Sequence, residues 1–426
     1  MRLCLIASKP TDSVILGFLP AAARLGLEVV LLTDKPEEHE LARVRSRQRP
    51  RPGCPRPGVG RDQEGHESDG PPARIVGCDV WDARELICSI AGRPAQHAIV
   101  SNSDHLQTQT ALAADYFGVP GKDWRSAMRA KNKSLMRRGL AGAGAEHVAA
   151  VEIRADGKAP DGLRYPVVLK PAEGVASEDV MLVISPEELA ERSAQILSRR
   201  PGETLLAEEY RSGGLRTLET LSDGKRTWVL GGFRTTLSPL PFFIGERLTW
   251  AAPAPEAARE HVLGALSSLG VAFGACHTEY VDGSRGPALI EVNDRLIGDD
   301  CDFVLSDLLG IDLFEFVLRV HLGESLPAEP PRPWGGAGHA VIDHVVADRP
   351  GVLAVVPPAG PRPTGQRDVL LSVRSLREAD DRVAVTHTNR DYLGVISAIG
   401  TDAAAVEGAV TAARAEENWP ITGPRS

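Results

Sequence analysis

The sequence is poor in aromatic residues and in cysteine, and it has no long hydrophobic run. Phe, Trp and Tyr make up 5% of the 426 residues. The six cysteines are scattered, without a CxxC pair or metal-finger spacing, which favours reduced, mostly buried thiols in a cytoplasmic protein. No stretch approaches the roughly 18–20 apolar residues that a bilayer-spanning helix needs. The first apolar run, residues 3–7, is too short for a signal-peptide core. We therefore expect no membrane partner.

The chain also lacks an excess of positive charge. Its 48 Lys and Arg residues face 57 Asp and Glu residues, which gives a formal net charge of -9. This balance argues against a broad surface for nucleic acid, although it allows a local basic site for a nucleotide. With 42% hydrophobic and 25% charged residues, the composition is that of an ordinary globular protein. A chain of this length is expected to form two to four compact units.

The first unit, residues 1–125, is expected to be a parallel α/β domain. Apolar runs at 3–7, 28–32 and 97–101 alternate with helical patterns, as in such domains. Between them, residues 49–74 are crowded with Pro, Gly and charge, which predicts a flexible surface insertion.

Three further units are expected, and the Pro-rich stretch 327–333 predicts a linker into a β-rich tail. Their boundaries are 126–212, 213–328 and 329–426. The expected strands are 165–170, 204–210, 215–221, 273–281, 288–293, 338–346, 352–356, 369–373 and 383–387. The expected helices are 131–145, 186–200, 256–269 and 403–416.

One predicted strand carries a polar motif, with Glu291, Asn293 and Arg295 at alternate positions. Side chains two apart in a strand point to one face, so these three are expected to lie together, with Leu289 on their side. The residues expected in the core are Ile290 and Val292.

Glu279 lies on the preceding predicted strand, across a glycine-containing turn at 282–286, which predicts a hairpin. Two carboxylates, an amide oxygen and a guanidinium suit a magnesium–phosphate site. The alternative is a solvated hairpin face with an incidental ion pair. We expect His277 to face away from Glu279 and to pack in the core.

Four segments occur in an order that resembles the ATP-grasp superfamily, and specifically its amino-acid ligase branch. They are Lys131–Arg137, Tyr165–Lys170, the small-residue loop Gly174–Ser177 and Leu205–Gly213, and the polar hairpin follows them. The resemblance implies a multidomain α/β and α+β protein with the ATP-grasp fold. An N-terminal parallel α/β domain and a C-terminal β-rich subdomain complete it.

The resemblance also implies an ATP site with Mg²⁺ or Mn²⁺. The residues that match nucleotide-binding positions are Lys133, Lys170, Gly174, Ser177, Glu208, Glu209, Tyr210, Arg211 and Arg234. Those that match the metal and catalytic positions are Glu279, Glu291 and Asn293 for the metal, and Arg295 for the transition state. Asn132 replaces the usual acidic residue, which leaves open whether Lys131 or Lys133 reaches phosphate. Leu215 stands where a ribose-binding acid is common, so the ribose contact is also open.

The implied activity is ATP-dependent joining of a small carboxylate, such as an amino acid, to an amine through an acyl phosphate, in specialised metabolism. The partners are then these small molecules, and a homodimer is compatible. Gly298, Asp299 and Asp300 border the expected amino-acid pocket, where one Asp pairs with the substrate ammonium or both cap the next helix. Two other functions remain: a carboxylase-like or purine-type ligase, and a regulatory nucleotide-binding module without turnover.

Overall fold

The computed structural model describes residues 1–46, 51–54, 73–153 and 163–423. Most of the predicted surface insertion 49–74 lies outside these ranges. Of the residues that are described, 51–54 do not behave as a loose insertion, since Cys54 is 1% exposed and Arg51 pairs with Asp307 at 2.9 Å, and Arg74 begins a strand. A short apolar and cationic segment inside the Pro-rich stretch is therefore packed against the body of the protein.

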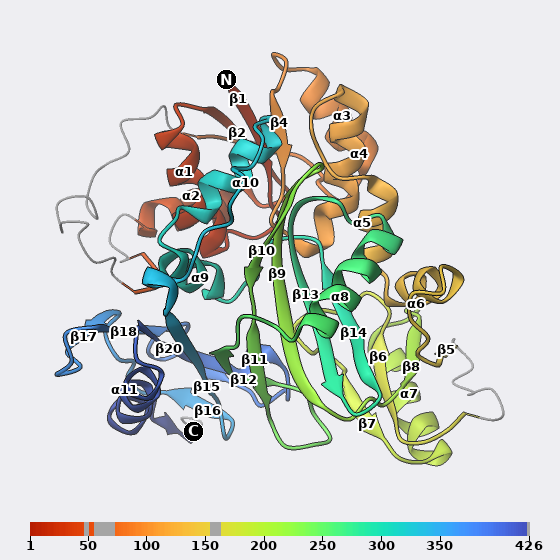
Figure 1. Ribbon diagram of the computed structural model, residues 1–426, viewed down its shortest axis with the longest axis vertical. Helices are drawn as coiled ribbons and strands as arrows, with labels where there is room; N and C mark the ends of the chain where they lie inside the picture. Colours follow the sequence, from red (N-terminus) through yellow and green to blue (C-terminus); the bar gives the residue numbers. More distant parts are fainter. Residues whose placement is uncertain (47–50, 55–72, 154–162, 424–426) are drawn as a thin grey trace.

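The N-terminal unit is a four-stranded parallel sheet in the order β3-β2-β1-β4, which confirms the predicted α/β domain (Figure 1). Its strands are β1 (Arg2–Ile6), β2 (Glu28–Thr33), β3 (Arg74–Gly77) and β4 (Ala98–Val100). Its helices are η1 (Ser13–Phe18), α1 (Leu19–Arg24), α2 (Pro36–Ser46), α3 (Ala83–Ala91), η3 (Asp104–Leu106) and α4 (Gln107–Phe117). Strands buried in such a sheet read as continuous apolar runs, and this is why the sequence revealed β1, β2 and β4. Strand β3, which is not buried, was not predicted.

A second, antiparallel sheet has the order β5-β8-β6-β7. Its strands are β5 (Ala150–Ile153), β6 (Val167–Pro171), β7 (Met181–Val183) and β8 (Leu205–Glu209), with α7 (Pro186–Arg199) beside them. The single helix expected over 131–145 is instead two helices, α5 (Trp124–Lys131) and α6 (Lys133–Gly142). Asn132 separates them because its side chain accepts a hydrogen bond from Leu135 N at 3.0 Å, which is an N-cap rather than an interior role.

A ten-stranded sheet runs through the rest of the molecule in the order β14-β13-β9-β11-β12-β15-β20-β18-β17, with β10 paired to β9. The strands before the tail are β9 (Gly214–Asp223), β10 (Thr227–Gly231), β11 (Phe233–Leu237), β12 (Gly245–Trp250), β13 (Phe273–Gly283) and β14 (Gly286–Asn293). The helices that accompany them are α8 (Glu256–Leu269), α9 (Cys301–Leu309) and α10 (Leu313–His321). Strands β10 to β12 were not predicted from the sequence.

The tail continues this sheet, because β15 pairs with β12. Its elements are η4 (Trp334–Gly336), β15 (His339–Val346), β16 (Gly351–Leu353), β17 (Gly360–Arg362), β18 (Val369–Ser375), β19 (Arg382–Val383), η5 (Asn389–Asp391), β20 (Tyr392–Gly400), α11 (Ala403–Glu416) and β21 (Ile421–Thr422). The predicted strands 338–346 and 369–373 and the helix 403–416 are present, whereas the strands predicted over 352–356 and 383–387 overlap only the short β16 and β19. The fully buried β20 was missed, although it lies at the centre of the tail.

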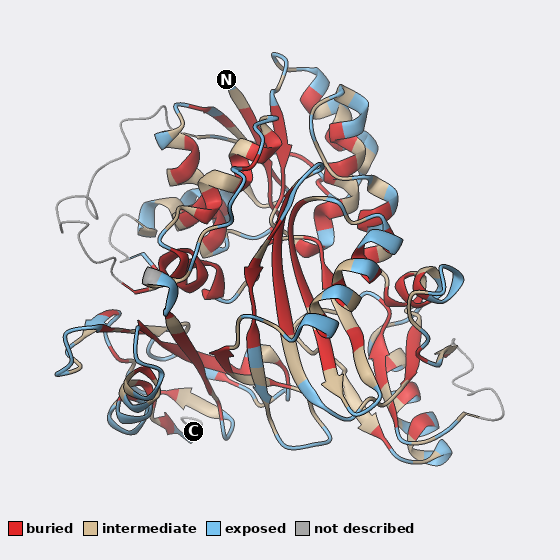
Figure 2. Cartoon of the chain, viewed as in Figure 1, coloured by how far each residue is buried: buried red, intermediate tan, exposed pale blue. Residues whose placement is uncertain are grey.

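The two faces of the large sheet pack against different helices, and buried residues follow its central strands (Figure 2). One face, with Leu221, Phe233 and Ile342, packs in a core shared with α9, α10 and the N-terminal unit. The other face, with Leu218 and Tyr280, packs against α8. In the described part of the chain, every helix is too short or too polar to cross a bilayer.

Candidate active site

The hairpin of β13 and β14 brings the two predicted carboxylates together as cross-strand partners. Glu279 lies opposite Glu291, whereas the next pair is Tyr280 with Leu289. A β-bulge at Ile290 therefore inserts one extra residue and reverses the alternation of side chains. For this reason the prediction that Leu289 shares the side of Glu291 was wrong: Leu289 is fully buried in the core beneath α8.

His277 faces the same side as Glu279, so the expectation that it points away was also wrong. Its Nδ1 lies 2.8 Å from Glu219 and its Nε2 lies 3.3 Å from Glu279. The cause is elementary, because residues two apart in a strand share a face. Burial alone would lower the pKa of His277, but Glu219 and Glu279 outweigh it and raise this pKa to about 10. The imidazolium in turn holds the pKa of Glu279 below its usual value, against the effect of burial.

Lys133 approaches the hairpin from the first turn of α6. Its Nζ lies 2.8 Å from Glu291 Oε1 and donates to the Gly174 carbonyl at 3.1 Å. Burial opposes the charge of Lys133, yet the Glu291 carboxylate raises its pKa. Lys131 instead pairs with Asp104. The geometry thus separates the two lysines whose roles the sequence left open, with Lys133 beside the carboxylate hairpin.

Lys170 lies on β6 and belongs to a buried ion network. Its Nζ lies 3.0 Å from Glu208 Oε1, and Arg137 contacts the other Glu208 oxygen at 2.7 Å. Burial alone would raise the pKa of Glu208, but Arg137 and Lys170 hold it at about 2. Burial lowers the pKa of Lys170. Glu208 is 2% exposed and both its oxygens are engaged, so its side chain positions the two cations. Only the backbone of 208–211 is then left to accept or donate hydrogen bonds to an adenine base.

The next residues of the expected hinge, 209–211, are partly buried. Arg285 pairs with Glu209 and donates to the Tyr210 carbonyl at 3.2 Å. Arg211 lies 3.7 Å from Glu209 and donates to the Arg285 carbonyl at 3.3 Å. Arg285, on the β13–β14 turn, therefore ties the hinge strand to the carboxylate hairpin.

The small-residue loop after β6 contacts Lys133 at one end and the tail at the other. Ser177 donates through Oγ to the Phe243 carbonyl at 2.8 Å, and Asn389 N donates to the Ala176 carbonyl at 3.0 Å. Ala176 and Ser177 both adopt φ of 55°, a conformation that costs non-glycine residues energy. The loop that begins at Gly174 is thus fixed by contacts with two distant segments.

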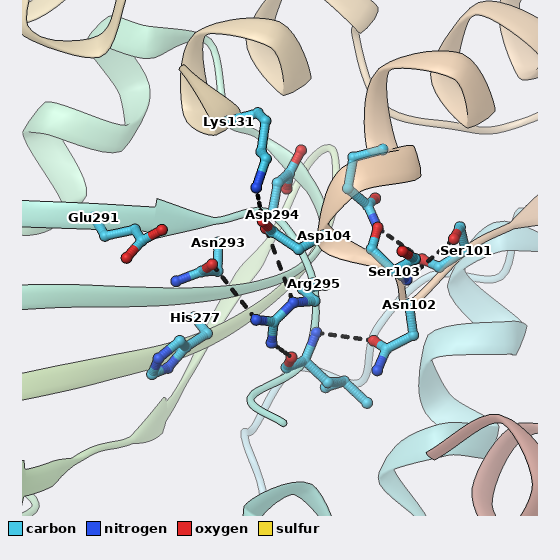
Figure 3. Close-up of polar contacts among 12 residues, drawn as sticks. Ser101, Asn102, Ser103, Asp104, Lys131, His277, Glu291, Asn293, Asp294 and Arg295 are labelled. Carbon is cyan, nitrogen blue, oxygen red and sulfur yellow. Dashed lines mark hydrogen bonds and ion pairs between the residues drawn. The ribbon is translucent and has the colours of Figure 1, made fainter. Parts of the chain in front are cut away.

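Arg295 follows β14 and meets the N-terminal unit (Figure 3). Its Nη2 lies 3.5 Å from Asn293 Oδ1, and its Nε lies 3.9 Å from Asp104. Asn102 accepts from Leu296 N at 3.2 Å. Sequence reasoning missed Asn102 and Asp104. Their place directly after a parallel strand is the signal that could have found them, because ligands bind at that edge of such sheets.

Asp299 and Asp300 differ in their surroundings. Asp300 occupies the N-cap position of α9 without a side-chain capping bond, and both its oxygens lie 2.5 Å from Arg374 of β18. Asp299 is exposed and has no cation partner among the described residues. Gly298 accepts a backbone hydrogen bond from Cys301 at 3.0 Å. Neither carboxylate caps the helix through its side chain.

Arg234 is not brought to this site. It lies opposite Arg216 on β9, and Arg216 lies opposite Tyr280 on β13. Cross-strand partners share a face. Arg234 is therefore on the α8 face of the sheet, whereas Glu279 is on the other face.

The donor set fits magnesium by its chemistry. Glu279, Glu291 and Asn293 offer hard oxygen atoms, and opposite residues of an antiparallel pair have Cβ atoms about 4.5–5.5 Å apart. Among the described residues, no group of three or more His, Cys, Asp or Glu side chains could by itself hold a metal ion. A site with few protein ligands suits Mg²⁺ bound through one or two carboxylates and substrate phosphates.

Comparisons with known proteins agree on the fold. No protein-family model matches the chain. An uncharacterized protein, y4rH, from Sinorhizobium fredii is 30% identical over 251 residues, which are 56% of this chain and 50% of that protein. The chain thus matches about half the length of this curated relative.

Three solved structures align over nearly the whole chain. An L-amino acid ligase from Bacillus licheniformis covers 99% of both chains with a TM-score of 0.76 and 20% identity. Phosphoribosylglycinamide synthetase from Anaerococcus prevotii covers 99% of both with a TM-score of 0.67 and 13% identity. The biotin carboxylase domain of 2-oxoglutarate carboxylase from Hydrogenobacter thermophilus, solved with MgADP and bicarbonate, covers 99% of this chain and 90% of its own, with a TM-score of 0.65 and 16% identity. The chain therefore has the ATP-grasp fold, and an L-amino acid ligase is among its structural neighbours.

Proposed function

We propose that the protein is an ATP-dependent ligase that joins a small carboxylic acid, in particular an amino acid, to an amine. The observation that carries this proposal is the convergence of Lys133, Glu279, Glu291 and Arg295 from distant segments on one edge of the large sheet. Two cations and two carboxylates in this arrangement suit a magnesium-bound triphosphate better than a solvated hairpin face. The L-amino acid ligase among the structural neighbours supports the amino-acid substrate class.

In the proposed reaction, ATP with Mg²⁺ supplies the phosphoryl group that turns a poor acylating agent into an acyl phosphate. Phosphoryl transfer of this kind depends on positioning and charge neutralisation. Glu279, Glu291 and Asn293 would hold the metal, and Lys133 and Lys170 would hold phosphate oxygens. The amine nitrogen then attacks the acyl carbon, loses a proton and expels phosphate.

Arg295 is positioned to stabilise negative charge both when the acyl phosphate forms and when the amine attacks it. Its guanidinium lies between Asn293 and Asp104, at the junction of the sheet and the N-terminal unit. A fixed cation at a developing oxyanion contributes about 3–4 kcal/mol to transition-state stabilisation.

The test is magnesium-dependent ADP release in a pairwise screen of amino acids and amines, with the products identified by mass. Glu291→Gln keeps the shape of the side chain but removes the charge, so ADP release should fall about 100-fold and the half-saturating Mg²⁺ concentration should rise. Lys225→Gln, on an exposed turn, is the matched control. ATP binding without turnover in any pair would favour a regulatory module, and turnover with bicarbonate as the only acid would favour a carboxylase-like enzyme.

Asp299 is the stronger candidate for the substrate ammonium, because Asp300 is already paired with Arg374. For Asp299→Asn we expect the KM for the amine to rise about tenfold, since a charge-assisted hydrogen bond is lost. The KM for ATP should not change. An unchanged KM for the amine removes Asp299 from this role.

A further inference from the structure

The segment that carries Asn293 and Arg295 leaves the large sheet in a sharp turn. The pairing of β13 with β14 ends at His277 and Asn293. Directly after this pair, Arg295 N donates to the Asn293 carbonyl at 2.8 Å, which is the hydrogen bond of a γ-turn centred on Asp294. The turn directs Arg295 away from the sheet and towards Asp104 of the N-terminal unit. The position of the Arg295 guanidinium therefore depends on what holds this turn.

The ammonium of Lys122 holds the turn at its central residue. Its Nζ donates to Asp294 Oδ1 at 2.8 Å, to the Asp294 carbonyl and to the Ala275 carbonyl at 3.2 Å. These three acceptors match the three N–H donors of an ammonium, so its hydrogen-bonding capacity is fully used. Because Ala275 lies on β13 and Asp294 follows β14, one side chain joins the two strands just beyond the end of their pairing.

Lys122 is itself fixed by the short loop between α4 and α5. Helix α4 ends at Gly118, which has a φ of 64°, and the Asp123 side chain caps α5 by accepting from Arg125 N at 3.0 Å. The aliphatic part of Lys122 packs against the backbone of β13, where a Cβ added to Gly274 would come within 2.8 Å of Lys122 Cε. The lysine is thus held both at its backbone and along its side chain.

The ion pair between Lys122 and Asp294 is buried on both sides. The two side chains are 8% and 2% exposed, and lysine is rarely buried to this extent unless it is paired. The second oxygen of Asp294, Oδ2, has no hydrogen-bond partner in the part of the chain that the structure describes. Loss of the ammonium would therefore leave a poorly compensated buried charge between Asn293 and Arg295.

We infer that Lys122 is a positioning residue for the proposed reaction: by holding the γ-turn at Asp294, it sets the places of the metal ligand Asn293 and of Arg295. Side chains that orient the ligands of a metal from behind typically account for about 10–100-fold in metal affinity or activity. The effect on catalysis rests on the proposed ligase function. The effect on the turn does not, because it can be measured without any ligand.

Hydrogen–deuterium exchange of the free protein tests the turn. The amides of Arg295 and Leu296 are both hydrogen-bonded in the wild type. In Lys122→Met they should exchange about tenfold faster, because the turn opens locally, while the amides of β9 exchange as in the wild type. Lys225→Met, on an exposed turn, is the control. Unchanged exchange at Arg295 and Leu296 overturns the inference, whatever the activity of the protein.

ADP release with the acid and amine found in the screen tests the effect on catalysis. Lys122→Met should lower kcat about tenfold and raise the half-saturating Mg²⁺ concentration. The KM for ATP at saturating Mg²⁺ should not change, because Lys133 and Lys170 reach the site from other segments. An enzyme with unchanged kcat and unchanged Mg²⁺ dependence overturns the inference and leaves the ligase function standing.

A second variant separates positioning from stability. In Lys122→Met with Asp294→Asn the unpaired buried charge is gone, so the melting temperature should return towards that of the wild type. The kcat should stay low and the exchange of Arg295 should stay fast, because the Ala275 and Asp294 carbonyls still lack the ammonium. Recovery of kcat together with the melting temperature shows a purely structural lysine and overturns the inference.

The failure of the ligase function would be recognised separately. If the wild type releases no ADP with any pair of substrates, the proposed function falls, and the exchange experiment still decides whether Lys122 holds the turn. If Lys122→Met alone does not fold, the double variant takes its place in both measurements.

Discussion

Glu208 shows how one buried carboxylate can hold two cationic side chains in place. Its carboxylate accepts from Arg137 and Lys170, and Arg137 is also held by Glu146 at 2.6 Å. Unpaired charges are expensive in a protein interior, so each partner of such a network depends on the others. Glu208 therefore fixes the position of Lys170, and its own contribution to stability depends on pH.

The sign of this dependence follows from the lowered pKa of Glu208, about 2 in the folded protein against 4.5 for the free group. Its stabilising contribution is present above pH 4.5 and is lost as the pH falls from 4.5 towards 2, and its size is about 3 kcal/mol. Glu208→Gln should lower the free energy of unfolding by about 3–5 kcal/mol at pH 7. Urea denaturation at pH 6 and pH 3 gives the free energy of unfolding of the wild type and of the variant. Between pH 6 and pH 3 the variant should lose less of this free energy than the wild type. Glu256→Gln, at an exposed helix end, should behave like the wild type.

At the scale of elements, the site depends on how closely β9 and β11 approach. Gly232, between β10 and β11, lies against the backbone of β9, where an added Cβ would come within 2.0 Å of the Thr217 carbonyl oxygen. Thr217 is itself opposite Glu279 on β13. A displacement of β9 is therefore passed directly to the carboxylate hairpin.

Gly232→Ala should destabilise the protein by about 1–3 kcal/mol, because rigid backbone cannot move aside as a flexible side chain can. Gly264→Ala, on the exposed side of α8 with no atom near the new methyl group, should instead stabilise it by about 0.5–1 kcal/mol. Thermal denaturation of the two variants compares the effects. Equal melting temperatures would contradict the close packing of β11 on β9.

At the scale of the whole molecule, the tail is part of the structure that holds the site. Strand β15 extends the large sheet beyond β12, and Ile342 and Val395 belong to the same core as α9 and α10. Arg374 of the tail also pairs with the buried Asp300 and with Asp12 of the N-terminal unit. The predicted boundary at residue 328 thus falls on a connection within one continuous sheet.

A fragment of residues 1–328 should not fold into an active enzyme. It would expose the edge of β12 and leave Asp300 without its cation, so we expect aggregation and no cooperative thermal transition. Calorimetry and gel filtration of the fragment and the full chain make the comparison. A monomeric fragment that releases ADP at the rate of the full chain would show that the tail is dispensable.

The sequence by itself determined the elements with a clear local pattern: the parallel strands β1, β2 and β4 of the N-terminal unit, α8, the hairpin of β13 and β14, and α11. It also predicted Glu279, Glu291 and Arg295 as site residues and left Lys131 and Lys133 as alternatives, because motifs and their order can be read without knowledge of the fold. Only the tertiary structure decided which faces these side chains occupy. The bulge at Ile290 reversed the expected side of Leu289, and pairing across three strands placed Arg234 on the far face. The physical reason is that strand register and long-range ion pairs are set by contacts between distant segments, which no local pattern records.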